Sequence, residues 1–174
     1  MNARFLTLVS IIIGVALFRY LPHPPNVSPV AAMALFAGAT FRDRRAAFLV
    51  PFAAMFAGDL LIGLHDTMIF VYLAFGITVL AGFALRKHQG VSAIAAAVVG
   101  SSVLFFLLTN LGMWMMSALY PMSAQGLMQA YAAGIPFFQN TLLGNLAFTA
   151  LLFGGFSLLL KHARWMQVHP VSHG

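Results

Sequence analysis

The chain alternates between long apolar runs and short polar turns, and this alternation is its main structural signal. Six apolar runs cover residues 5–21, 29–41, 46–64, 67–85, 91–119 and 136–160. A transmembrane helix needs about 20 predominantly apolar residues, and all but the second run reach or approach that length. The pattern predicts an all-α, polytopic membrane protein with six transmembrane helices.

The second run is the exception, because its 13 residues are too few for an ordinary span. We expect a short second helix that is tilted inside the bundle or extended by a partly embedded loop. If this run only enters and leaves the same face, five spans remain, and the basic clusters at 42–45 and 86–87 fall on opposite faces. Basic residues collect on the cytoplasmic side, so six spans is the better interpretation.

The boundary before the last run is less regular. Residues 120–134 are moderately polar and contain no Lys or Arg, so we expect a loop or short helix over the outer mouth of the bundle. Pro136 suits the first position of a helix, where its missing N–H costs nothing. We therefore predict that the last helix begins there.

Composition strengthens the membrane interpretation. Only 7% of the residues are charged, 61% are hydrophobic and the mean hydropathy is +0.94, whereas a soluble domain carries about 25% charged residues. Residues 1–174 are expected to form a single transmembrane domain. Arg19 follows the first run without a small-residue cleavage signal before it, so this run is expected to be a retained span.

The basic residues predict the orientation. If the runs are spans, eight of the nine lie on one side of the membrane: Arg4, Arg42, Arg44, Arg45, Arg86, Lys87, Lys161 and Arg164. The positive-inside rule then predicts a multi-pass protein of the bacterial cytoplasmic (inner) membrane with both termini cytoplasmic. The bases form no stripe, so the net charge of +6 does not indicate a nucleic-acid partner. Arg19 alone lies at the opposite side.

Polar side chains gather by depth toward that outer side. The candidate substrate-binding residues are Arg19, Tyr20, His23, Asn26, Asp59, His65, Tyr72, Asn110, Trp114, Gln139 and Asn140. Polar groups at membrane depth are costly unless they are paired or face water, so the set predicts a ligand-filled cavity that opens outward. Structural alternatives exist for each member, namely an Arg19–Asp59 ion pair between helices, interfacial histidines, an aromatic belt and interhelical amide hydrogen bonds.

Roles within this cavity follow from side-chain chemistry. Arg19 would pair with a carboxylate or phosphate of the ligand, or with Asp59 when the cavity is empty. Neutral hydrogen bonds would come from Asn110, Gln139 and Asn140. The rings of Trp114 and Tyr72 would stack on a planar part of the ligand.

Small residues recur at four-residue spacing within the runs. The pairs are Ser10 with Gly14, Ala34 with Gly38, Ala54 with Gly58, and Ala96 with Gly100. Such pairs let helices approach closely in lipid. They indicate either ordinary packing within one bundle or, most plausibly at Ser10 and Gly14, a face that docks onto a partner membrane subunit.

Motifs for catalysis are missing from the sequence. It contains no Walker A loop, HExxH or GxSxG motif, and it has no cysteine for a nucleophile or a thiolate metal site. We expect neither an enzyme nor a bound metal or cofactor.

Residues 22–30, the Ala-rich stretch up to Arg42-Asp43-Arg44-Arg45 and the segment 48–59 resemble a family of small bacterial membrane proteins grouped with transporters. The six-helix plan with a short second helix is similar to the S components of energy-coupling factor (ECF) vitamin importers. That resemblance implies a ligand near the extracellular face, walled here by residues 22–28, 65–66 and 120–135. Solitary cobalamin-type S components are similar in size, but they hold cobalt through a cysteine that this chain lacks. A corrinoid would need His23, His65, a Met, or no axial ligand.

We therefore expect an ECF S-component-like subunit that captures a vitamin-sized small molecule from the extracytoplasmic side of the lipid bilayer. A corrinoid is one candidate for this molecule. Its partner would be an ECF-type energising module or another membrane subunit. The alternatives are an assembly or structural protein of a membrane complex, and a self-contained carrier of a small solute.

Overall fold

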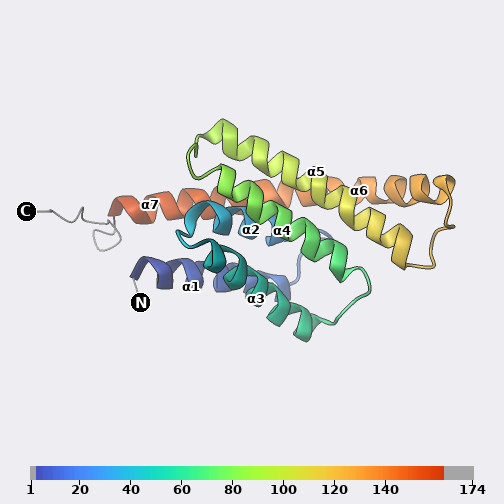
Figure 1. The fold of residues 1–174 in the computed structure, drawn as a ribbon, viewed down its shortest axis with the longest axis horizontal. Helices are drawn as coiled ribbons and strands as arrows, with labels where there is room; N and C mark the ends of the chain where they lie inside the picture. Colours follow the sequence, from blue (N-terminus) through green and yellow to red (C-terminus); the bar gives the residue numbers. More distant parts are fainter. Residues whose placement is uncertain (1–2, 163–174) are drawn as a thin grey trace, which may run out of the picture.

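The computed structural model describes residues 3–162, which are helical throughout apart from their connecting turns (Figure 1). The helices are α1 (Ala3–Leu17) with a 3-10 turn at Phe18–Tyr20, α2 (Val30–Thr40), α3 (Arg44–Ile62), α4 (Met68–Ala84), α5 (Val91–Met116) and α6 (Ala124–Thr149). A π-helical segment, Ala150–Gly154, continues α6 directly into α7 (Gly155–His162). The expected all-α class is confirmed.

Successive helices run up and down, so their connections fall at two ends (Figure 1). One end holds the start of α1, the α2–α3 and α4–α5 turns and the end of α7. We call it the basic end, because every Lys and Arg that the structure describes, except Arg19, belongs to it: Arg4, Arg42, Arg44, Arg45, Arg86, Lys87 and Lys161. The other end is called the polar end. Arg164 lies outside the described residues.

Four helical stretches are long and apolar enough to cross a membrane, namely Ala3–Tyr20, Arg44–Ile62, Val91–Met116 and Ala124–His162. The shorter apolar helices are Val30–Thr40 and Met68–Ala84. The chain is therefore a helical membrane protein, with four helices that meet the length of a span and two that are shorter.

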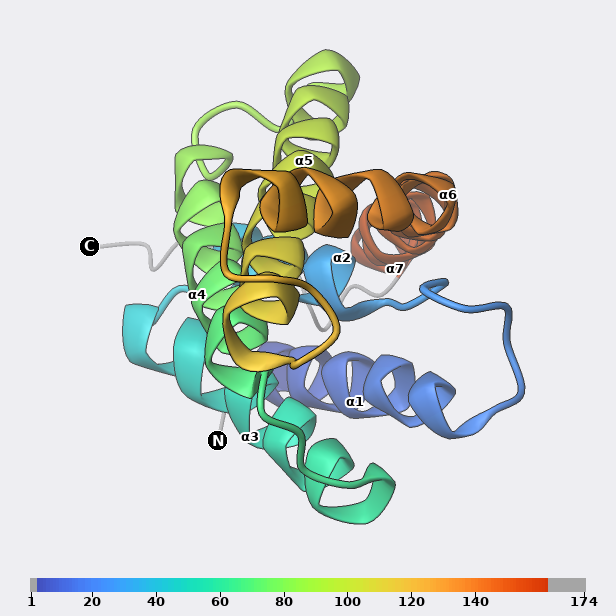
Figure 2. The same ribbon diagram turned by 90° about the vertical axis from the view of Figure 1, so that its right-hand side faces the viewer.

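The short second helix is confirmed, and it is the most enclosed element of the fold. All 11 residues of α2 are buried, and the helix lies in the middle of the bundle (Figure 2). Its closest neighbour is α4: a Cβ atom at Gly38 would lie 2.2 Å from the carbonyl oxygen of Val79, and one at Gly82 would lie 2.4 Å from that of Leu35. Only glycine allows this approach, so Gly38 serves packing within the bundle.

The other small-residue pairs differ from this one. No heavy atom lies within 4 Å of the Cβ position of Gly14 or of Gly100, so both positions are open. A Cβ atom at Gly58 would lie 2.9 Å from Nη1 of Arg19.

Arg86 closes the C-terminal end of α2. Its Nε donates to the carbonyl of Gly38 at 2.9 Å and its Nη2 to that of Phe41 at 2.7 Å. A cation suits this position because the last carbonyls of a helix carry partial negative charge. Burial, and then the positive charge of Arg44, lower the pKa of Arg86 from its usual value. Arg86 therefore contributes to the joint between α2 and α4 as well as to the charge of the basic end.

The last helix begins earlier than the sequence indicated. We predicted a loop or short helix over 120–134 and a helix start at Pro136, but α6 begins at Ala124 and Pro136 lies inside it. Ser123 supplies the N-cap, and its Oγ accepts from the Gly126 N–H at 3.2 Å. The prediction of the helix start was wrong because it relied on Pro136 as a first helical residue and did not recognise Ser123 as an N-cap.

Candidate ligand-binding site

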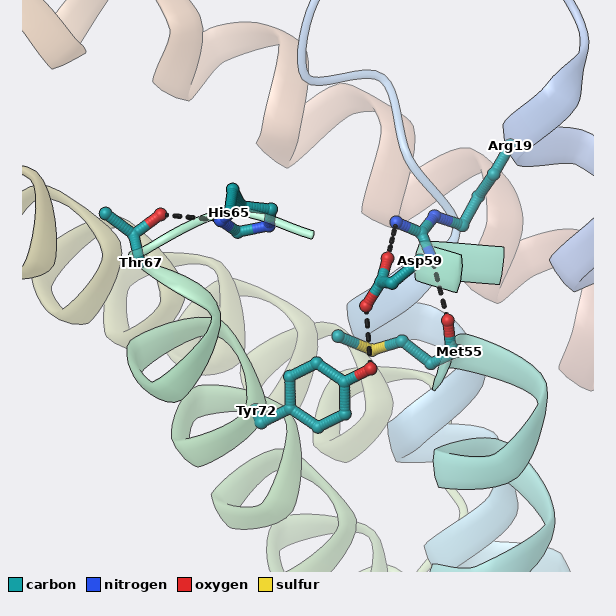
Figure 3. A network of polar contacts seen from close by, with 6 residues as sticks. All are labelled: Arg19, Met55, Asp59, His65, Thr67 and Tyr72. Carbon is teal, nitrogen blue, oxygen red and sulfur yellow. Dashed lines mark hydrogen bonds and ion pairs between the residues drawn. The ribbon is translucent and has the colours of Figure 1, made fainter. Parts of the chain in front are cut away.

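Arg19 and Asp59 form an ion pair at the polar end (Figure 3). Arg19 lies on the 3-10 turn that follows α1, and its Nη2 donates to Oδ1 of Asp59 at 2.5 Å. Its Nη1 donates to the main-chain carbonyl of Met55 at 3.2 Å. Asp59 is only 2% exposed. The predicted pairing of these two charges is confirmed.

Tyr72 completes the surroundings of the carboxylate. Its hydroxyl donates to Oδ2 of Asp59 at 2.7 Å, so both oxygens of the buried acid have a partner (Figure 3). The three residues come from the end of α1, from α3 and from α4. The triad adds polar contacts between α3 and α4 near the polar end, next to the ring contacts of Phe52 with Tyr72 and Phe75.

A cavity of about 450 Å³, the outer chamber, lies between α4, α5 and α6 at the polar end. Four phenylalanines contribute to its walls, Phe105 and Phe106 from α5 and Phe137 and Phe138 from α6, beside small and aliphatic residues such as Val71 and Ala130. The rings of Phe106 and Phe138 lie 5.2 Å apart. Neutral polar groups interrupt this surface: Asn26, Thr67, Thr109, Asn110, Tyr120 and Thr141.

A smaller cavity of about 140 Å³, the inner chamber, reaches Arg19, Met55 and Asn145. Four residues line both chambers, namely Asn26, Val71, Phe105 and Thr141, so the two adjoin. Asn145 is held in place because its Nδ2 donates to Oγ of the buried Ser102 at 2.9 Å. Together the chambers give a larger compartment, partly lined by aromatic rings, and a smaller extension that Arg19 lines.

Residues 1–168 match the profile of a family of unknown function, DUF6580. The protein belongs to the DUF6580 family. No curated protein and no solved structure matches the chain.

In this DUF6580 protein, six of the eleven predicted site residues belong to the chambers or support them. Arg19, Asn26 and Asn110 are lining residues. Asp59 pairs with Arg19, and Tyr72 donates to Asp59. Asn140 acts on the loop between α1 and α2, since its Nδ2 donates to the carbonyl of Pro25 at 3.0 Å, one residue before Asn26.

The other five predicted residues line neither chamber. The ring of His23 stacks on Phe18 at 5.6 Å, and Nδ1 of His65 contacts Oγ1 of Thr67 at 2.9 Å. The Trp114 indole donates to the carbonyl of Pro121 at 2.9 Å and so fixes the α5–α6 turn. Gln139 is exposed, and Tyr20 lines a separate apolar groove between α1 and α3.

Several lining residues carried no clear signal in the sequence. The main ones are the Phe-Phe pairs at 105–106 and 137–138. In a chain that is 61% hydrophobic, phenylalanines of a binding site cannot be told apart from those that pack or face lipid. The pairing itself was the available clue, because each pair lies within five residues of a polar side chain, Asn110 or Thr141.

The groups that line the chambers are mostly uncharged. Across residues 3–162, no three His, Cys, Asp or Glu side chains come together in a way that could hold a metal ion. The chambers offer ring faces, neutral hydroxyl and amide groups, and one guanidinium. These groups suit a small organic molecule with an apolar body and a hydrogen-bonding tip.

Proposed function

We propose that this protein is a substrate-capture subunit of the bacterial inner membrane, similar to an ECF S component, which binds a vitamin-sized molecule from the extracytoplasmic side. The observation that carries the proposal is the pair of adjoining chambers at the polar end. Sites for small molecules occupy about 300–1000 Å³ and combine apolar walls with a few placed polar groups, and the outer chamber of about 450 Å³ has both properties.

The proposed orientation follows from charge. All described basic residues except Arg19 belong to the basic end, and the positive-inside rule places such an end in the cytoplasm. The chambers then open outward, and both termini are cytoplasmic. In this proposal α2 and α4 count as the second and fourth of six spans, because each connects helices that run in the opposite direction.

The size of the chambers favours a ligand smaller than a corrinoid. A corrin macrocycle with its side chains exceeds the outer chamber. Neither His23 nor His65 lines this chamber, and Met113 is the axial-ligand candidate that does. The proposal therefore concerns a compact vitamin-sized molecule.

A blocking substitution tests the proposed function. Thr141 lines both chambers, so Thr141→Phe should fill the passage between them. Gln139→Phe is the matched control, because it adds a similar ring on the same helix at an exposed position. Small molecules that co-purify with the detergent-solubilised protein are identified by mass spectrometry. We expect one species in wild type and Gln139→Phe that is lost in Thr141→Phe; the absence of any such species would refute the capture role.

One observation supports the alternative of a structural subunit. The helix faces around Gly14 and Gly100 are open, as a surface that docks onto another membrane protein would be. Under that alternative, substitution of Gly14 by a large residue would abolish a function that Thr141→Phe leaves intact.

A further inference from the structure

The inner chamber ends at a charge that is already balanced. Among the residues that line the two chambers, all within the described part of the chain, Arg19 is the only charged one. Its side chain is 17% exposed, whereas that of Asp59 is 3% exposed. Arg19 is therefore the more accessible member of the pair and lines the inner chamber, whereas Asp59, which neutralises it, lines neither chamber.

Arg19 still has hydrogen-bonding capacity. A guanidinium carries five N–H donors, and the described residues accept two hydrogen bonds from it, at Asp59 and at Met55. The remaining donors are available to a ligand. These N–H groups require an acceptor atom on the ligand. The net charge around Arg19 decides whether an ionised or an uncharged acceptor is favoured.

Electrostatics disfavour an ionised acceptor. A ligand carboxylate at Arg19 would place two negative charges around one positive charge in a site of low dielectric, and the excess charge would be costly. An uncharged carbonyl oxygen takes the same donors without that cost. The other polar groups that face the chambers, such as Asn110, Thr109 and Thr141, are neutral as well.

Resting on the proposed function, we infer that the ligand is an uncharged aromatic molecule whose carbonyl or carboxamide oxygen accepts from Arg19. Its planar body lies in the outer chamber against Phe105, Phe106 and Phe138, where ring pairs favour offset or edge-to-face contact. Its polar tip enters the inner chamber, whose volume of about 140 Å³ admits a small group only. This replaces the anionic partner that side-chain chemistry alone suggested for Arg19.

A matched pair of probes tests the inference. Anthracene-2-carboxamide and anthracene-2-carboxylate have the same shape and differ in charge. Binding to the purified full-length protein is measured by fluorescence anisotropy, and the signal of Thr141→Phe is subtracted to remove partitioning into detergent. We expect the carboxamide to bind wild type about tenfold more tightly than the carboxylate, or better.

Asp59→Asn supplies the second arm of the test. This variant leaves the charge of Arg19 unbalanced, so the preference should move toward the carboxylate by about tenfold or more. The double variant Arg19→Gln/Asp59→Asn contains no unbalanced charge and guards against misfolding of the single variant; it should show no gain for the carboxylate.

The results separate the inference from the proposed function. Wild type that binds the carboxylate as tightly as the carboxamide, or a double variant that gains carboxylate affinity, would overturn the inference. Failure of both probes to bind would also overturn it. In that case a co-purifying molecule that is lost in Thr141→Phe would still support capture, whereas its absence would refute capture as well.

Discussion

Arg19 and Asp59 lie 40 positions apart in the chain, yet their side chains form an ion pair of 2.5 Å at the polar end of the bundle. Tyr72 binds the second carboxylate oxygen from another helix. The pair is both a joint between helices and the inner limit of the candidate site.

Asp59→Asn should destabilise the protein strongly. Removing one partner of a buried ion pair leaves an uncompensated charge, which costs about 3–5 kcal/mol. Asp43→Asn is the control, because Asp43 is an exposed N-cap whose Oδ1 accepts from the Arg45 N–H, and Asn caps nearly as well as Asp. The measurement is the melting temperature of each variant in one detergent. Equal shifts for the two variants would show that the ion pair is not structural.

Tyr72→Phe should destabilise less than Asp59→Asn. It removes one hydrogen bond to a charged group, worth about 1.5–3 kcal/mol. Tyr131→Phe is a suitable control, since its hydroxyl donates to a single main-chain carbonyl, that of Leu107, at an exposed position. In the double variant Tyr72→Phe/Asp59→Asn, the loss of stability should be smaller than the sum of the losses in the two single variants. A loss equal to that sum would argue against the contact.

Gly38→Ala should prevent stable folding. Its Cβ atom would lie 2.2 Å from the main-chain oxygen of Val79, and a backbone cannot move aside as a side chain can, so we expect a cost above the ~3 kcal/mol of ordinary overpacking. Gly100→Ala is the control, with no heavy atom within 4 Å of the new methyl group. Recovery of monodisperse protein on size exclusion gives the readout. A Gly38→Ala protein that elutes and melts like wild type would contradict the described α2–α4 contact.

Asn110→Ala should weaken ligand retention while the fold persists. The side chain lines the outer chamber and donates to its own helix at the carbonyl of Phe106. Loss of one hydrogen bond to a ligand costs about 1–3 kcal/mol, or roughly five- to hundredfold in affinity. The amount of co-purified molecule and the melting temperature are measured on the same sample, with Gln139→Ala as control. A fall in melting temperature without loss of the molecule would assign Asn110 to helix packing.

The orientation can be tested with single cysteines, because the natural chain contains none. Lys87→Cys lies at the basic end and Asp66→Cys at the polar end, and both positions are exposed. A membrane-impermeant maleimide applied to intact cells should label position 66 and leave position 87 unlabelled until the cells are opened. Labelling at 87 in intact cells would reverse the proposed orientation.

The sequence was sufficient for most helix boundaries. Apolar runs that end in prolines or charged residues predicted α1 to α5 to within a few residues, because bilayer and breaker signals coincide there. The Arg19–Asp59 pair could be anticipated for a similar reason, since both charges lie at the same depth and neither is explained by topology. Pro136 misled because a proline inside a long helix and a proline at its start look alike in one sequence.

Lateral contacts between helices were beyond such reasoning. Gly38 belonged to a recognised small-residue pair, but its partner Gly82 lies on another helix, and depth alone does not say which helices are adjacent. Gln139 lies two positions before Thr141, which lines both chambers, yet Gln139 is exposed and lines neither. Depth predicts the end of the bundle at which a residue lies, whereas rotation about the helix axis decides whether it lines the site.

The brevity of α2 also bears on how the protein enters its membrane. An 11-residue helix spans about 16 Å, roughly half of the hydrocarbon thickness. We therefore expect α2 not to insert into the bilayer as an independent span. Its enclosure by the other helices (Figure 2) means that lipid does not stabilise it afterwards either. We therefore expect α2 to reach its final place only after α4 has been synthesised and has brought Gly82 to Gly38, which makes the centre of the bundle one of the last parts to assemble.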